Sequence, residues 1–524
     1  MLGELIYSSI GLVLLAYILN YVFSLADDTQ EPKRINPKVP LIGHAIGMAK
    51  YGPSYFTNTS RTVDAEIYTL PILNTKVYVN NSLRLMPLIQ KASKTISFRP
   101  FIEISAQKIA GNTYAGAKLF DGPLVDDFDH ILKKTLAPGP WLDEQNLRTG
   151  QVAVAHVDDL VNGGKGKRMW LQEWARHVIV QASSSGVFGK EHPFLDPVVE
   201  GKFWEMQKYI PLRLVNLDLF DGAGKAREVI VRALLKYCAA PPADAARTFY
   251  ERQRVLREGG MSFEDATKQE VSLAIALFGS TSATMFWIIW ELFSRLELLA
   301  EVREEIETQA VSRRESDEKG RAHGGAEFVL DVAALKIRCP LLLSFVQETQ
   351  RTRHVHANVR MVLEDTLLDD GKYLLRKGNY LVIPGSPIHA DANVWGESVG
   401  TFDPYRFLGG EGKTNRKGVI VNDTMVPPSG FLAWGVPPHL CPARQFAATE
   451  VLIIVALLAM RVELIPVANN GRWEKTPALK HSELVAIFNP AEDKEMYAKP
   501  RAQAVGKWTL KMGESMTRVP IASG

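Results

Sequence analysis

The segment best suited to chemistry is the loop that carries Cys441 and leads into a long apolar run. A lone cysteine is most often a buried structural thiol, because free cysteine behaves as a small hydrophobe. Here, however, Pro442 follows Cys441 directly, and proline is favoured at the first position of a helix. The sequence therefore predicts that Cys441 lies at a helix N-terminus, where backbone N–H groups and the helix dipole stabilise a thiolate. A thiolate held in a dry site is a soft ligand for iron.

Hydroxyl side chains form a second chemical group at the centre of the otherwise apolar segment Val271–Trp290. They belong to Ser280, Thr281, Ser282 and Thr284. The segment is long enough to span a bilayer, but its central hydroxyls and the charged residues at its ends favour a helix buried through a protein core. These hydroxyls could order water beside a bound group, or they could bond back to carbonyls one turn earlier, and the sequence leaves both alternatives open.

A carboxylate and a guanidinium three residues apart form the third group. Glu348 and Arg351 share one face of a predicted helix, so their side chains can meet. An exposed pair of this kind would contribute well under about 1 kcal/mol. The apolar run that follows Pro340 instead favours a buried pair.

Short strands and longer helices must position these groups. The β-like runs are Glu66–Leu70, Lys76–Val79, Val359–Leu363, Tyr373–Leu375 and Tyr380–Ile383. Val271–Trp290 and Phe446–Met460 are apolar on nearly every face, which is typical of core helices. There is no internal repeat and no clear domain break after residue 45. The pattern predicts one large, mainly α domain with small, mostly antiparallel sheets, an α+β arrangement.

Composition excludes several classes of protein. Of the 524 residues, 46% are hydrophobic and 23% charged, which is too apolar for a disordered chain. The formal net charge is only +3, so a nucleic-acid partner is not expected. Three cysteines in a chain of this length exclude a disulfide scaffold and indicate a reducing compartment.

The N-terminus has the pattern of a membrane anchor. Leu5 to Leu25 is a nearly unbroken apolar run that would span roughly 30 Å as a helix, the thickness of a bilayer core. Lys33, Arg34 and Lys38 follow the run, so the positive-inside rule predicts a lumenal N-terminus and a cytosolic body. A cleaved signal peptide is the alternative, but the positive n-region is missing. We expect an anchor at residues 1–26, a stiff Pro-rich hinge at 27–44 and one catalytic domain at 45–524.

The Cys441 loop resembles that of the cytochromes P450, the haem-thiolate monooxygenases. Their fingerprint is F-x-x-G-x-[RH]-x-C-x-G, and the matching span runs from Trp434 to Ala443. Trp434 stands in the aromatic position, His439 in the basic position and Cys441 in the ligand position. Pro437 and Ala443 replace the two usual glycines.

Three further motifs agree with the resemblance. Glu348 and Arg351 match the E-x-x-R pair of the family, and Trp395-Gly396 and Phe402–Phe407 resemble its W-G and P-E-R-F elements. The resemblance implies that Arg406 completes a buried network with Glu348 and Arg351 beneath the haem.

The resemblance also implies a cofactor and its ligands. Haem b would be bound through Cys441, and Arg360 and His439 resemble the partners of the haem propionates. The central helix lacks the acidic residue that usually precedes the family's threonine. Thr281 is the expected proton-relaying hydroxyl, and Ser280 is the alternative in a shifted register.

The implied activity is the oxidation, by hydroxylation or otherwise, of a lipophilic small molecule such as a terpenoid, a steroid or a related secondary metabolite. It would use O2 and electrons from NADPH-cytochrome P450 reductase, on a single-pass protein of the endoplasmic reticulum membrane, in contact with membrane lipid. The departures from the usual motifs resemble biosynthetic members from filamentous fungi.

Two other functions stay open. The missing acid and Phe286-Trp287 resemble the branch with prostacyclin synthase and sterol 7-hydroxylases, some of which rearrange oxygenated substrates without O2 or a reductase. The second is a non-catalytic, membrane-tethered carrier of haem or of a lipophile.

Overall fold

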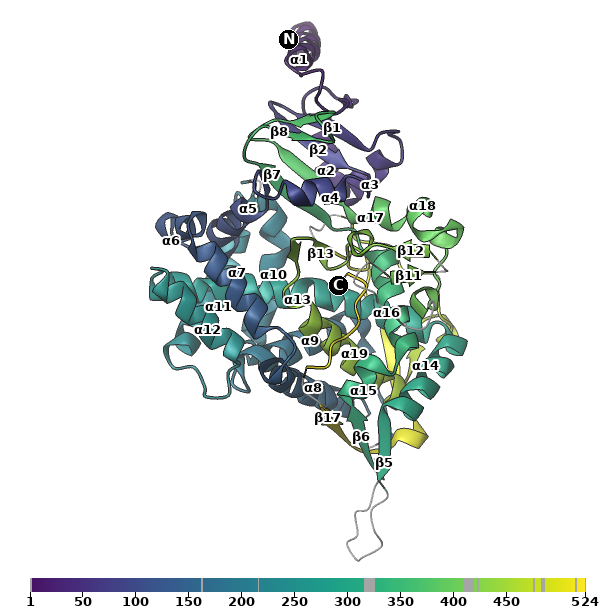
Figure 1. The fold of residues 1–524 in the computed structure, drawn as a ribbon. Helices are drawn as coiled ribbons and strands as arrows, with labels where there is room; N and C mark the ends of the chain where they lie inside the picture. Colours follow the sequence, from purple (N-terminus) through teal and green to yellow (C-terminus); the bar gives the residue numbers. More distant parts are fainter. Residues whose placement is uncertain are drawn as a thin grey trace, which may run out of the picture.

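A mainly helical body is joined to a smaller β-rich lobe that lies next to the N-terminal helix (Figure 1). The computed structural model describes residues 2–161, 164–214, 216–314, 326–408, 419–421, 424–474, 476–481, 486–513 and 516–523. The predicted fold class, mainly α with small sheets, is confirmed.

The centre of the body is the helix α13 (Phe263–Phe293). By length and composition it could cross a membrane, but 72% of its apolar window is buried inside the protein. It packs against α9 (Leu171–Phe188), α16 (Pro340–Arg353) and α19 (Arg444–Arg461). The interpretation of Val271–Trp290 as a core helix is therefore confirmed, because burial among protein helices satisfies its apolar faces.

The other helices form the periphery of this core. They are α2 (Gly43–Tyr51), α3 (Ser54–Ser60), α4 (Met86–Lys91), α5 (Arg99–Ile104), α6 (Tyr114–Lys118), α7 (Leu124–Thr135), α8 (Pro140–Leu160), α10 (Pro197–Leu214), α11 (Gly222–Ala239), α12 (Arg247–Glu258), α14 (Leu296–Gln309), α15 (Val332–Ile337), α17 (Gly385–His389) and α18 (Ala392–Trp395).

The largest sheet has five strands in the order β1-β2-β10-β7-β3, and only the β2–β10 pair is parallel. Its strands are β1 (Ile67–Ile72), β2 (Thr75–Asn80), β10 (Tyr380–Pro384), β7 (Ala357–Val362) and β3 (Ile96–Ser97). The predicted strands are all present, with ends displaced by up to two residues. The sheet brings β7 beside the helical body, and with it Arg360.

Five smaller sheets complete the fold. They are β15 (Val462–Pro466) with β16 (Glu495–Pro500) and β4 (Lys167–Trp170); β17 (Gly506–Lys511) with β6 (Ala326–Asp331) and β5 (Val311–Arg314); β8 (Thr366–Leu368) with β9 (Tyr373–Leu375); β11 (Val419–Val421) with β12 (Thr424–Val426); and β13 (Gly435–Val436) with β14 (His439–Leu440). Apart from β17–β6, their pairs are antiparallel.

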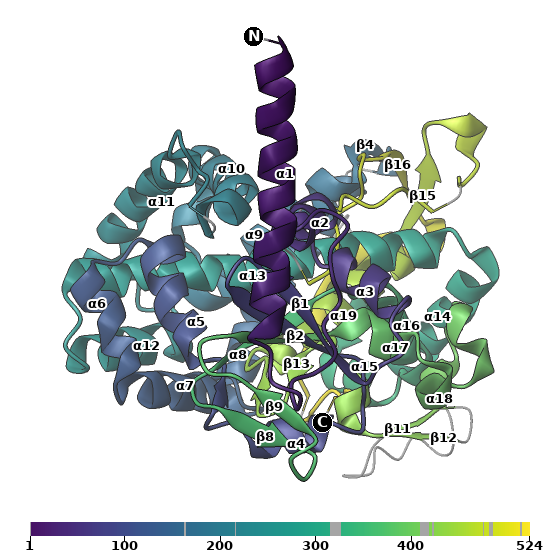
Figure 2. The same ribbon diagram turned by 90° about the horizontal axis from the view of Figure 1, so that it is seen from above.

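The N-terminal helix α1 (Leu2–Leu25) projects from the body, and Figure 2 shows it standing clear of the other helices at its N-terminal end. Its 24 residues give a length of about 36 Å. From Leu12 to Leu25 it exposes large apolar side chains, with 68% of the Leu12 surface accessible. A helix this apolar and this exposed has no partner in the described protein that covers it.

The Pro-rich segment after α1 is held against the sheet. The Ile35 N–H donates to the Thr69 carbonyl at 2.9 Å, and the Thr69 N–H donates to the Lys33 carbonyl at 2.9 Å. Lys76 forms salt bridges with Asp27 and with the Glu31 carboxylate, each at 2.7 Å. These contacts fix the direction in which α1 leaves the body.

Candidate active site

A tight hairpin positions Cys441. Strands β13 and β14 pair Gly435 with Leu440, and the Cys441 N–H donates to the Trp434 carbonyl at 2.7 Å. Gly435 has a φ of +101°, and a Cβ there would lie 2.8 Å from the His439 carbonyl oxygen. The hairpin therefore requires glycine at this position, and it holds the cysteine backbone in one place.

The helix after this loop begins later than predicted. α19 starts at Arg444 with Ala443 as its N-cap, so Pro442 lies outside the helix and the prediction that it opens the helix is wrong. The reason is a turn in which the Cys441 carbonyl accepts from the Arg444 N–H at 3.3 Å. Burial raises the pKa of the Cys441 thiol, while the Ala443 N–H and the Arg444 charge act in the opposite direction. The sulfur thus still meets a helix N-terminus, as expected of a ligand cysteine.

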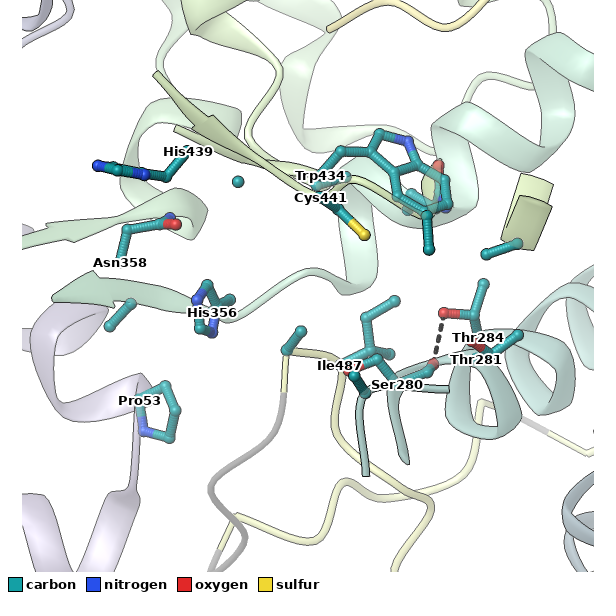
Figure 3. A pocket seen from close by; sticks show the side chains of 18 of the residues that line it. Pro53, Ser280, Thr281, Thr284, His356, Asn358, Trp434, His439, Cys441 and Ile487 are labelled. Atoms are coloured by element: carbon teal, nitrogen blue, oxygen red, sulfur yellow. Dashed lines mark hydrogen bonds between the residues drawn. The ribbon is translucent and has the colours of Figure 1, made fainter. Parts of the chain in front are cut away.

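The thiol opens on a cavity of about 690 Å³. Figure 3 shows the Cys441 sulfur on one side of it and Ser280 and Thr281, from α13, on the other. Most of the remaining lining is apolar and comes from distant segments; it includes Met48, Phe56, Phe101, Leu214, Leu277 and Ile487. The space between the thiol and α13 can therefore hold a large, flat, mostly apolar group.

The four hydroxyls at the centre of α13 divide into two pairs. Thr284 Oγ1 donates to the Ser280 carbonyl at 2.8 Å (Figure 3), and the Ser282 hydroxyl donates to the Gly279 carbonyl at 3.2 Å. Ser280, Thr281 and Thr284 line the cavity, and of these the Ser280 and Thr281 hydroxyls bond to no other residue in the described part of the chain. Back-bonding to carbonyls therefore occurs at Ser282 and Thr284, while the Ser280 and Thr281 hydroxyls stay available to order water.

Arg360 is a buried cation at the edge of the cavity. Only 5% of it is exposed, and its guanidinium donates to the Val359 and Val436 carbonyls at 2.9 and 3.3 Å. No carboxylate of the described ranges forms an ion pair with it, and burial lowers its pKa to about 10. A buried cation without a counter-ion is unfavourable. An anion is therefore expected in the cavity.

His439 lies beside this cation and also lines the cavity (Figure 3). Its ring packs against Phe98 at 5.8 Å between centroids. Burial lowers the pKa of His439 to about 4, and the Arg360 charge acts in the same direction. The ring is therefore neutral near pH 7 and can donate a single hydrogen bond to an anion.

Glu348, Arg351 and Arg406 meet in the interior behind the Cys441 loop. Arg351 Nε and Nη2 donate to the two Glu348 carboxylate oxygens, each at 2.7 Å. The Arg406 side chain reaches the same carboxylate, and its Nη groups donate to the carbonyls of Trp395 and Ser398. The carboxylate accepts from both guanidinium groups, and backbone carbonyls accept most of their remaining N–H groups.

His389 connects this network to the Cys441 loop. The Leu432 N–H donates to His389 Nε2 at 2.8 Å, so Nδ1 carries the proton and donates to the Arg351 carbonyl at 3.1 Å. Burial lowers the pKa of His389 to about 3, which keeps this arrangement neutral. Sequence reasoning missed His389, because its partners lie 38 and 43 positions away.

Sequence reasoning also missed Gln350, on α16, and three further polar residues that line the cavity, namely His356, Asn358 and Glu450. The first two lie at the start of β7, beside Arg360, and the third lies on α19. An alternation of polar and apolar residues along 356–360 was the available signal for the first two. Nothing marked Glu450 except its place in an apolar helix.

Comparison with known proteins agrees with this geometry. The family model "Cytochrome P450" matches residues 227–482. Over 99% of the chain and 100% of the relative, the sequence is 31% identical to the cytochrome P450 monooxygenase nodJ of Hypoxylon pulicicidum. The chain belongs to the cytochrome P450 family. It is an oxidoreductase of the haem-thiolate monooxygenase class, whose members bind haem b through a cysteine thiolate.

More distant proteins give the same family and fold. The human 7-alpha-hydroxycholest-4-en-3-one 12-alpha-hydroxylase is 29% identical over 42% of this P450 and 44% of its own length. The structure of retinoic acid-bound cyanobacterial CYP120A1 superposes with a TM-score of 0.67 at 16% identity, covering 91% of this chain and 100% of that one. The monooxygenase names of the fungal relatives do not support the rearrangement or carrier alternatives. Eukaryotic P450 monooxygenases take electrons from a redox partner and act on lipophilic substrates.

Proposed function

We propose that Cys441 is the iron ligand and that this P450 oxidises a lipophilic small molecule, such as a terpenoid, a steroid or a related secondary metabolite. The observation that carries the proposal is that the Cys441 sulfur and the unpaired, buried Arg360 guanidinium face one apolar cavity. Haem b needs a soft thiolate ligand for its iron, a cation for its propionates and apolar walls for its ring, and this cavity offers all three. The two propionates of haem would supply the anions that Arg360 lacks.

The protein's own side chains have distinct tasks in this proposal. When bound, haem supplies the activation of O2. Arg360 and His439 hold the propionates, and the network of Glu348 with its two arginines keeps the Cys441 loop in position. The free hydroxyl of Thr281, with Ser280 as the alternative, holds and passes a proton on the opposite side of the cavity.

The apolar lining supports a lipophilic substrate. Phe56, Phe101 and Leu214 come from three separate elements and leave few polar contacts for a hydrophilic molecule. The name of the human relative, a hydroxylase of a cholestenone, agrees with a polycyclic lipophile, although it describes that protein only.

We further propose that α1 anchors the protein in the endoplasmic reticulum membrane, with a lumenal N-terminus and a cytosolic catalytic domain. The exposed apolar surface of α1 and the basic residues after it support this. The division into an anchor at 1–26, a hinge at 27–44 and a catalytic domain at 45–524 belongs to the same proposal. The electron donor would be NADPH-cytochrome P450 reductase on the same membrane face.

The first experiment tests the iron ligand. Reduced, carbon monoxide-saturated membranes should show the red-shifted absorbance of thiolate-ligated haem, and Cys441→Ser should abolish it. Cys238→Ser is the matched control, because Cys238, on α11, does not line the cavity. A wild-type absorbance band in Cys441→Ser would contradict the assignment.

The second experiment tests the reaction. Membranes with the protein and the reductase should convert members of a terpenoid and steroid panel to products one oxygen heavier, with NADPH required. Product formation without NADPH, from a peroxide or an epoxide, would instead indicate rearrangement. Ligand binding with no NADPH consumption would indicate a carrier. Removal of residues 1–26 should release the protein from membranes and leave its carbon monoxide spectrum unchanged.

A further inference from the structure

One wall of the cavity carries a buried amide without a partner. Asn358, in β7, is only 5% exposed, and its Nδ2 donates to no other group of the described ranges. It lines the cavity, and Figure 3 shows its side chain directed inward. Buried amide N–H groups are nearly always hydrogen-bonded, because an unmade bond loses the hydration of the group and gains nothing. Asn358 Nδ2 is therefore available to donate to a molecule bound in the cavity.

A second polar side chain lies next to it. The His356 backbone is fixed on both sides, since its N–H donates to the Ala486 carbonyl at 3.1 Å and its carbonyl accepts from the Gly385 N–H at 3.0 Å. Its ring lines the cavity (Figure 3), and its ring nitrogens form no hydrogen bond with another residue of the described ranges. Burial lowers the pKa of His356 to about 4, with the Arg360 charge acting in the same direction. Near pH 7 the ring has one donor and one acceptor.

Away from Arg360, the wall beside this pair is apolar. Pro53 and Ile487 line the cavity there, and the Cys441 sulfur and Thr281 lie farther along (Figure 3). A ligand that reaches from the pair to the centre of the cavity thus meets polar groups at one end and apolar walls along its length.

We propose that His356 and Asn358 bind a neutral oxygen, either a hydroxyl or a carbonyl, of an otherwise apolar substrate and thereby select which carbon lies near the haem. This rests on the proposed function and narrows its substrate class to lipophiles that already carry an oxygen. Asn358 Nδ2 donates to that oxygen, and His356 donates to a carbonyl or accepts from a hydroxyl. A hydrocarbon without oxygen leaves both groups unpaired.

A haem propionate is the competing partner of Asn358, because Arg360 lies two residues further along the same strand face. His356 lies on the side of Asn358 away from Arg360 along the chain, which favours a ligand other than the propionate at this end of the cavity. The experiment below separates the two partners by measuring haem content and ligand affinity in the same samples.

The test uses the full-length, haem-loaded protein in detergent and three probes: a saturated steroid hydrocarbon, its monohydroxyl derivative and its monoketone. Dissociation constants are measured from the shift in haem absorbance on ligand binding. In the wild type the oxygenated probes should bind about tenfold more tightly than the hydrocarbon, as expected for one or two buried hydrogen bonds. Asn358→Leu, which keeps the side-chain size, should weaken the oxygenated probes about tenfold and change the hydrocarbon less than twofold.

Two further variants make the result specific. His356→Phe keeps a ring but removes both nitrogens, and it should also reduce the preference for oxygenated probes. Ser282→Ala is the matched control, because Ser282 does not line the cavity and its hydroxyl already bonds to the Gly279 carbonyl. It should leave the ratio of affinities unchanged.

Three outcomes would overturn the proposal. Asn358→Leu with strongly reduced haem content would assign the amide to a propionate. Equal weakening of all three probes would show a packing defect, and an unchanged ratio would show that Asn358 does not touch the ligand oxygen. Failure of the proposed function has a different signature, since the wild type would then lack the red-shifted carbon monoxide band altogether.

Discussion

Arg406 Nε donates a hydrogen bond to Glu348 Oε2 at 3.1 Å, although the two residues lie 58 positions apart. Neither side chain has any exposed surface. The same carboxylate accepts from the Asp403 N–H at 3.0 Å, so it joins α16 to the segment that precedes the Cys441 loop. The Glu348–Arg406 pair therefore fixes the segment around Asp403 against α16.

Glu348→Gln should destabilise the protein severely. The change leaves the guanidinium groups of Arg351 and Arg406 buried without a counter-charge, and breaking a buried pair in this way costs roughly 3–5 kcal/mol. We expect a large fall in melting temperature and in haem content, measured by circular dichroism and by absorbance. Glu301→Gln is the control, since this exposed carboxylate bonds only to the Tyr405 hydroxyl on the same segment and should change stability by less than about 1 kcal/mol. Equal stability of the two variants would contradict the role of the network.

Arg360→Gln should affect the protein with haem and the protein without it in opposite directions. Without haem, Arg360 is a buried charge with no carboxylate partner in the described ranges, so its removal should leave the melting temperature equal or higher. With haem, loss of the propionate contact should reduce haem content several-fold. On one preparation, the melting temperature is measured before and after haem is supplied, and the haem content is measured after it.

Arg376→Gln is the matched control for this change. Arg376 follows β9 in the same lobe, but it is partly exposed and pairs with Asp365 at 2.7 Å. Its replacement should leave haem content unchanged. If both variants retained full haem content, Arg360 would have no part in binding the cofactor.

Thr281→Ala should uncouple electron use from product formation. Its hydroxyl lines the cavity and bonds to no residue of the described ranges, so it is available to hold a proton or a water there. We expect the ratio of product formed to NADPH consumed to fall several-fold while the affinity for substrate stays close to that of the wild type. The ratio is obtained by measuring product and NADPH in one assay.

The control for this prediction lies one turn along the helix. Thr284→Val removes a hydroxyl that already bonds to the Ser280 carbonyl, so coupling should not change. A normal ratio in Thr281→Ala together with a reduced one in Ser280→Ala would transfer the role to Ser280.

The parts of the fold that follow from short-range patterns could be predicted from the sequence. The strand at Tyr373–Leu375 was placed without error, and the apolar segment Val271–Trp290 lies within α13. Hydrophobic periodicity and turn residues determine such elements. The E-x-x-R spacing likewise predicted that Glu348 and Arg351 lie on one helix face, and their side chains do meet.

Contacts between distant segments could not be predicted. The two-residue delay of α19 depends on a turn at Cys441, whose geometry is set by the β13–β14 hairpin. His389 acquires its role only because α17 lies against the segment at Leu432. The Ser183–Glu450 pair joins α9 to α19 across 267 positions. In each case the sequence gives the residue, but tertiary packing supplies the partner.

Glu450 makes the stability of the protein depend on pH. Its carboxyl is only 1% exposed, and its partner is the Ser183 hydroxyl at 2.7 Å. Burial raises the pKa of Glu450 from 4.5 to about 8, although the hydrogen bond from Ser183 acts in the opposite direction. Below pH 4.5 the group is protonated in the folded and unfolded states alike, so it makes no difference to stability. Between pH 4.5 and 8 only the unfolded state loses the proton, so the folded state loses stability as pH rises.

Glu450→Gln should remove this dependence, because the amide has the same size and does not titrate. The gain in unfolding free energy of the variant over the wild type should grow by roughly 3–5 kcal/mol from pH 4.5 to pH 8. The measurement is the difference in melting temperature between the two proteins at pH 4.5 and at pH 8. All other titrating groups are the same in both proteins, so their contributions cancel in this difference. Ser183→Ala should extend the dependence to higher pH, because it removes the hydrogen bond that favours the charged carboxyl. If wild type and Glu450→Gln melted with a constant difference at every pH, Glu450 would have an ordinary pKa and water would reach it through the cavity.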